Sequence, residues 1–104
     1  ARDELQAATV RLHSEVAQAR ERLSTITAEI QSLQQDVLPG AKSAYDAATI
    51  GFENGKFNFL EVLDAQRTLF SAQDQLAQLR LARLSDAVNL YKALGGGWSR
   101  QEPI

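Results

Sequence analysis

Apolar residues recur every three or four positions between Leu5 and Val37. A mean spacing of about 3.5 residues is typical of a helix that packs along a coiled-coil seam. Charged residues such as Arg11, Glu15 and Glu29 occupy the positions between them. The pattern therefore predicts a long helix with one apolar edge. The apolar positions are Leu5, Leu12, Val16, Ala19, Leu23, Ile26, Ile30, Leu33 and Val37.

A Pro39-Gly40 pair interrupts this pattern. Proline inside a helix lacks the N–H donor and presses on the preceding turn, so it bends or breaks the helix. No polar linker surrounds the pair, and residues 41–50 return to a helical composition. We therefore expect one helix over residues 1–50, kinked near Pro39.

A chain reversal is predicted at residues 51–57, because Asn54-Gly55 accepts positive φ at little cost. Asn58 is suited to cap a second helix, with Glu61 in the capping-box position. That helix is predicted over residues 58–94, which contain neither glycine nor proline. The three glycines at 95–97 predict its end, followed by an irregular tail over residues 95–104.

The second helix carries two apolar stripes. A single partner helix covers only one of them, so the other needs a further helix from the same protein or from another copy. The isolated chain is therefore expected to self-associate. The Leu60 stripe consists of Leu60, Leu63, Phe70, Ala77, Leu81, Leu84, Val88 and Tyr91. The Val62 stripe consists of Val62, Leu69, Ala72, Leu76, Leu79, Leu90 and Leu94.

The predicted fold class is all-α: a single long antiparallel coiled-coil helical hairpin spanning residues 1–104. The 11 basic and 13 acidic residues are interspersed, and the formal net charge is −2, so a nucleic acid partner is not expected. The chain has no cysteine, and His13 is its only histidine, so we expect no metal site. No catalytic constellation or phosphate-binding loop is present, so we expect neither an enzyme nor a bound cofactor.

The chain begins with alanine and shows no signal peptide. We therefore expect it to be a segment of a longer protein, with any targeting signal upstream. No apolar run reaches the ~20 residues that a membrane-spanning helix needs.

Three motifs resemble the TolC-like outer membrane factor family. GKFNFLEVLDAQRTLF, from Gly55 to Phe70, is similar to the tip motif of the family's second repeat. LYKALGGGW, from Leu90 to Trp98, is similar to its usual ending, and Leu38-Pro39 matches a pair found before the tip in many members. The Gly-Lys-Phe at residues 55–57 is most similar to the heavy-metal branch typified by CzcC and CusC.

The resemblance implies a transport function. Family members are homotrimers of the outer membrane of Gram-negative bacteria, with a helical tunnel across the periplasm. The tips of their hairpins meet a periplasmic adaptor (membrane fusion protein), which connects them to an inner-membrane pump. This chain would form part of the periplasmic tunnel in a tripartite export system for metal ions or small toxic compounds.

The resemblance also implies roles for particular residues. The adaptor-docking tip would consist of Gly51, Phe52, Asn54, Gly55 and Lys56. The pore or gate candidates are Glu61 and Asp64. Both sets have plainer alternatives: a turn without a partner, and carboxylates that cap or favour the start of a helix. Phe57 and Phe52 stand where TolC carries arginine and tyrosine, so that gate's hydrogen bonds do not carry over intact.

Two other interpretations of the sequence remain open. One is a structural coiled-coil oligomerisation module unrelated to transport, which would not need two apolar stripes on one helix. The other is the hairpin of an adaptor protein, which is flanked by lipoyl-like β segments that are not visible here.

Overall fold

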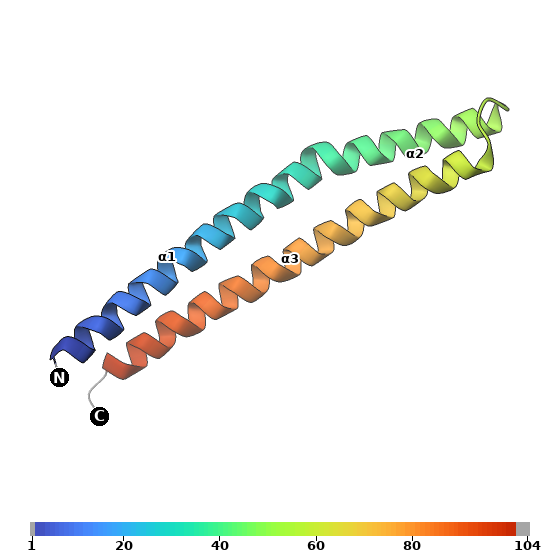
Figure 1. Ribbon diagram of the computed structural model, residues 1–104. Helices are drawn as coiled ribbons and strands as arrows, with labels where there is room; N and C mark the ends of the chain where they lie inside the picture. The colour runs from blue at the N-terminus through green and yellow to red at the C-terminus, as the bar shows by residue number, and fades with distance from the viewer. Residues whose placement is uncertain (1, 102–104) are drawn as a thin grey trace. The chain divides into compact units, whose positions relative to one another are not determined.

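The computed structural model describes the backbone of residues 2–101 and the side chains of residues 2–95. Apart from a loop at residues 54–58, the described backbone is helical and contains no strand. Its elements are α1 (Arg2–Ser32), a π-helical turn (Leu33–Val37), α2 (Leu38–Glu53) and α3 (Phe59–Gln101) (Figure 1). The predicted all-α class and its two long helical stretches are confirmed.

The chain divides into two compact units. The tip unit spans Ala28–Arg80 and contains the loop with the adjoining parts of the helices. The terminal unit combines Ala1–Thr27 with Leu81–Ile104, as far as those residues are described. Each unit contains part of the apolar seam.

In the terminal unit, the predicted seam of α1 is largely withdrawn from solvent. Ala19 is buried, and the nearby Arg22 Nε lies 3.8 Å from Asp86 Oδ2 of α3. This ion pair is partly exposed, so it contributes about 0.5 kcal/mol or less, and apolar burial dominates. Leu5 is exposed, which places the start of the buried seam after it. The half-buried members are Leu12, Val16, Leu23 and Ile26.

In the tip unit, side chains from both sides of the loop form the best-buried part of the seam. Ile30 is only 3% exposed and Leu76 only 6%. Several members are alanines, whose small side chains allow helix backbones to approach closely. The buried residues of this unit are Ile30, Leu33, Ala41, Ala48, Gly51, Val62, Ala72 and Leu76.

The backbone stays helical across Pro39, but the preceding turn is a π turn. The Leu38 N–H donates to the Leu33 carbonyl, five residues back, instead of four. A π turn holds one residue more than an α turn, and proline is a common neighbour of such departures because it lacks the N–H of the regular ladder.

The extra residue moves the seam by one position along the sequence. A strict heptad continued from Leu33 would bury residues 37, 40, 44 and 47, yet all four are exposed. The withdrawn residues are instead Leu38, Ala41, Tyr45 and Ala48. The prediction that Val37 belongs to the seam is therefore wrong, because periodicity in the sequence cannot register a local change in residues per turn.

The tip turn is shorter and later than predicted. Helix α2 continues through Gly51 and Phe52 to Glu53, so the non-helical residues are 54–58 instead of 51–57. Gly51 does not terminate the helix, because the positive φ that ends it belongs to Gly55 (φ +74°). Helix α3 then begins at Phe59.

The glycine triplet does not end α3, which runs on to Gln101. The predictions of an end at Leu94 and of an irregular tail from residue 95 are therefore wrong as far as Gln101. Glycine costs a helix about 1 kcal/mol relative to alanine, and it commonly ends a helix where it is left-handed and its N–H bonds to one of the last carbonyls. Among the described residues, only Gly55 has a positive φ. The side chain of Trp98 lies outside the described residues.

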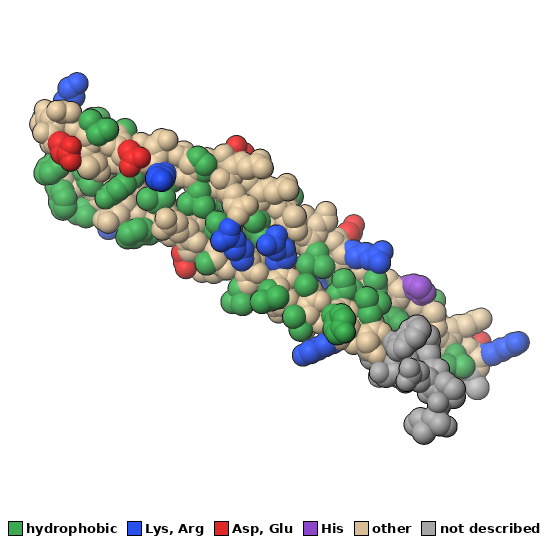
Figure 2. Space-filling view, turned by 180° about the vertical axis from the view of Figure 1, so that it is seen from behind, with side chains coloured by type: hydrophobic (Ala, Val, Ile, Leu, Met, Phe, Trp, Pro, Cys, Tyr) green, Lys and Arg blue, Asp and Glu red, His purple; other side chains and the backbone are tan. Residues whose placement is uncertain are grey.

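The two stripes of α3 differ sharply in exposure. In the Val62 stripe, Val62, Ala72 and Leu76 are buried. The large residues of the Leu60 stripe are exposed in both units, among them Leu60 at 67% and Leu81 at 67%. Many hydrophobic side chains accordingly lie at the surface in Figure 2. The prediction that one stripe of this helix is left uncovered is confirmed within the single chain.

The π turn generates a test by deletion. Removing Gln35 together with Pro39→Ala should convert the π turn to an α turn and leave Leu33, Leu38 and Ala41 on the seam. Removing Ser43 together with Pro39→Ala should rotate the buried and exposed faces on either side of residue 43 by about 100° relative to each other. We expect the first variant to lose less than about 1 kcal/mol of unfolding free energy and the second at least 2 kcal/mol.

Thermal and urea unfolding followed by circular dichroism measures both losses. Equal losses for the two deletions would show that the π turn does not set the register of the seam.

Candidate functional site

Backbone hydrogen bonds tie the loop that leaves α2 to the last turn of that helix. The Lys56 N–H donates to the Gly51 carbonyl at 2.7 Å, and the Gly55 N–H donates to the Phe52 carbonyl at 3.0 Å. This pair of bonds, with Gly55 left-handed, is the Schellman arrangement that satisfies the last carbonyls of a helix. The Asn54 side chain adds a bond from Nδ2 to the Ile50 carbonyl at 3.0 Å.

Helix α3 starts with the predicted side-chain cap. Asn58 Oδ1 accepts a hydrogen bond from the Glu61 N–H at 3.1 Å, which satisfies one of the free donors of the first turn. Asn58 is therefore confirmed as the N-cap. The loop has little freedom left, because a capped helix end precedes it and another follows it within five residues.

Three phenylalanines lie in this loop or directly beside it, and each remains about half exposed. Phe52 is 44% exposed, Phe57 45% and Phe59 54%. The rings of Phe52 and Phe59 lie 5.5 Å apart between centroids and are tilted by 57°, an ordinary aromatic contact. Neither Phe57 nor Phe59 was among the predicted docking residues, although the three phenylalanines between residues 52 and 59 are visible in the sequence.

Gly51 was predicted to lie in the turn at residues 51–57 but lies in helix α2. It is buried inside α2, and a Cβ built on it would lie 3.0 Å from Cγ of Phe57 and closer still to two further ring atoms. The ring of Phe57 therefore occupies the space that a side chain at residue 51 would need.

The charged candidates near the tip all lie on the surface. Lys56, Glu61 and Asp64 are exposed, and none of them forms an ion pair with another described residue. The Asp64 carbonyl accepts a bond from Thr68 Oγ1 at 3.1 Å, which leaves the carboxylate itself unengaged. These charges are available to water or to a partner.

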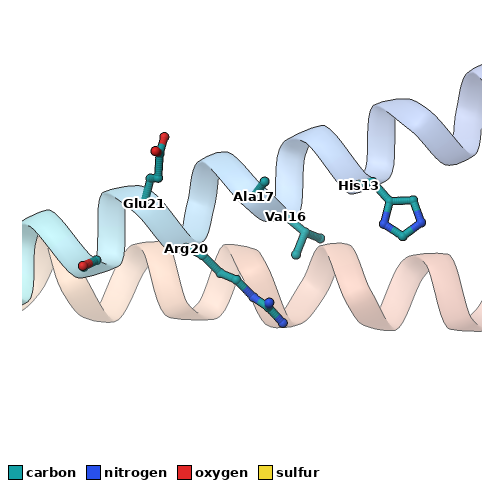
Figure 3. Close-up of a pocket in the computed structure, with 6 residues that line it drawn as sticks. His13, Val16, Ala17, Arg20 and Glu21 are labelled. Carbon is teal, nitrogen blue, oxygen red and sulfur yellow. The ribbon is translucent and has the colours of Figure 1, made fainter.

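A shallow depression lies on α1 within the terminal unit. His13 and Arg20 point to one side of the helix in this depression, whereas Glu21 points to the other (Figure 3). Side chains that diverge in this way cannot converge on one ligand. Throughout the part of the chain that the structure describes, no group of three or more histidine, cysteine or acidic side chains is placed to hold a metal ion.

None of the helices, over the residues that the structure describes, combines the length and apolarity needed to cross a membrane.

Comparison with known proteins gives a consistent result. Residues 1–96 match the outer membrane efflux protein family. The chain is 55% identical over 73 residues to the cobalt-zinc-cadmium resistance protein CzcC of Cupriavidus metallidurans. It is 52% identical over 65 residues to the pyoverdine export outer membrane protein OpmQ of Pseudomonas aeruginosa. It is 43% identical over 84 residues to the toluene efflux pump outer membrane protein TtgF of Pseudomonas putida.

These matches take in 70%, 62% and 81% of this chain but only 18%, 14% and 17% of the relatives. No solved structure matches the chain. The resemblance to TolC-like outer membrane factors that the tip motif predicted is confirmed, with CzcC among the relatives. The chain belongs to the outer membrane efflux protein family.

Proposed function

We propose that this chain is a periplasmic tunnel segment of an outer-membrane efflux channel. In this proposal α1 and α2 form the descending limb of an antiparallel hairpin, kinked near Pro39, and α3 forms the ascending limb. The Phe52–Phe59 contact in the tip unit and the Arg22–Asp86 pair in the terminal unit support limbs that run side by side. The π turn before Pro39 supports the kink.

The relatives support a conduit without cargo selection. Their names refer to metal resistance, to pyoverdine export and to toluene efflux, yet each is 43–55% identical to this chain over 65–84 residues. A segment shared at this level is poorly suited to distinguish a metal ion from an aromatic solvent. The cargo is metal ions or small toxic compounds, selected by the inner-membrane pump.

The exposed Leu60 stripe supports assembly as a homotrimer in the full-length protein. Helix α3 has three faces: the Val62 stripe, which is largely withdrawn from solvent; the exposed Leu60 stripe; and a polar face. A helix in the wall of a helical tunnel needs the same three surfaces. One faces its hairpin partner, one faces the neighbouring hairpin and one faces water. The exposed polar face includes Asp64, Thr68, Ser71, Gln75 and Gln78.

The observation that carries the docking part of the proposal is the ordered loop at 54–58. Four of its backbone N–H groups, at residues 54–57, donate hydrogen bonds to carbonyls of α2, and the side chains of Lys56, Phe52 and Phe59 are exposed. A preformed tip loses little conformational entropy on binding, which favours contact with a periplasmic adaptor. The docking residues are Gly51, Phe52, Asn54, Gly55 and Lys56.

Docking is tested by changing the left-handed residue of the tip. Gly55→Val should cost about 1–2 kcal/mol in its present conformation and distort the loop, whereas Gly55→Asn keeps access to positive φ. In the full-length protein, we expect cross-linking of Lys56 to the adaptor to fall at least threefold for the valine variant and to stay near wild type for asparagine. Unchanged cross-linking and export in the valine variant would remove the docking claim.

Self-association is tested on the chain itself. The exposed Leu60 stripe should drive the isolated chain into dimers or small bundles. Sedimentation equilibrium should show this assembly, and Leu81→Glu with Leu84→Glu should weaken it at least tenfold. The matched control, Ser71→Glu with Gln78→Glu, adds the same charge to the polar face and should leave it unchanged. A stable monomer across a wide concentration range would contradict the role of the stripe.

The pore role of Asp64 is tested by conductance. A trimer would place three copies of this exposed carboxylate near the tunnel entrance, where they would attract cations. Asp64→Asn should lower the cation selectivity of single-channel currents at low salt. Asp46→Asn, on the exposed side of α2, is the control. Equal selectivity in wild type and the Asp64 variant would assign Asp64 to an ordinary helix surface, and Glu61 can be tested in the same way.

A further inference from the structure

Gly51 differs from the other described glycines in helices. A Cβ added at Gly40 or at Gly95 would meet nothing within 4 Å. At Gly51 it would lie 2.5 Å from Cε2 and 3.0 Å from Cγ of Phe57, distances that packed side chains do not reach. A helical glycine is less favourable than alanine, so a buried one that seats a ring has a specific packing reason.

The backbone of Gly51 makes a second kind of contact with the loop. Its carbonyl accepts hydrogen bonds from the N–H groups of Lys56 at 2.7 Å and Phe57 at 3.2 Å. Residue 51 therefore contacts two adjacent loop residues: its carbonyl accepts hydrogen bonds from Lys56 and Phe57, and the lack of a side chain leaves room for the ring of Phe57. Lys56 directly precedes Phe57 in the sequence, so the direction of the Lys56 side chain depends on the position of the Phe57 ring.

We infer that Phe57 is a positioning residue of the docking tip, seated on Gly51, and that residue 51 controls docking without a side chain that touches the partner. The inference rests on the proposed function, because it specifies how the tip is held for the adaptor. Phe57 is 45% exposed, so one side of its ring is available to a partner while the other side occupies the seat.

The experiment is a double-mutant cycle in the full-length protein. Gly51→Ala fills the seat, Phe57→Ala removes the ring, and the double variant does both. Gly40→Ala is the matched control, since it makes the same change in the same helix where nothing is nearby. Two quantities are measured: hydrogen exchange of the amides at residues 56 and 57, and the yield of Lys56 cross-linking to the adaptor.

We expect Gly51→Ala to speed exchange and to lower cross-linking by at least threefold each, with Gly40→Ala near wild type. Adding Gly51→Ala to Phe57→Ala should change neither quantity further, because no ring is left to displace. A purely additive cycle, or Gly51→Ala behaving like Gly40→Ala, would overturn the inference.

The two readouts separate the inference from the function on which it rests. If Gly51→Ala speeds exchange without changing cross-linking, the packing of Phe57 on Gly51 is supported but its role in docking is overturned. Absence of adaptor cross-linking in the wild-type protein would overturn the proposed docking function, while exchange would still report on the seat alone.

Discussion

Burial of one narrow apolar seam is the interaction on which this chain depends. Two long helices have no interior, so residues such as Ile30, Ala72 and Leu76 supply most of the apolar area removed from water. No polar side chain is buried in the described part of the chain, and no polar network helps to specify the pairing. Packing of small and medium side chains therefore sets the register, with little contribution from charge.

Much of this arrangement could be predicted from the sequence because the seam is periodic. The spacing of apolar residues predicted helix over α1 and located its buried edge from Leu12 to Leu33, although Leu5 is exposed. Asn58 could be recognised as a cap because a cap needs one short polar side chain at one position. Counting faces predicted that one of the two stripes would stay exposed, since one partner helix cannot cover both, but not that it would be the Leu60 stripe.

What the sequence did not predict depends on local geometry that no single residue type encodes. The π turn before Pro39 changes the number of residues per turn, and only coordinates reveal the resulting shift from Val37 to Leu38. Gly51 reads as a helix stop until the ring of Phe57 is seen in its place. The triplet at 95–97 also reads as a stop, because glycine often ends a helix in a left-handed cap, yet α3 continues through it to Gln101. At the candidate site, Asn54, Gly55 and Lys56 form the reversal as predicted, while Gly51 and Phe52 belong to α2.

The π turn also bears on how such a rod can change in length. A strict heptad seam accepts insertions of three, four or seven residues, because other steps turn the apolar edge away from its partner. A π turn absorbs a single residue and returns the following helix to the same edge, as Leu38, Ala41 and Tyr45 do here. A helix with this device can therefore carry one residue more than a strict heptad allows, so its length can change by a single residue without redesigning the seam on either side.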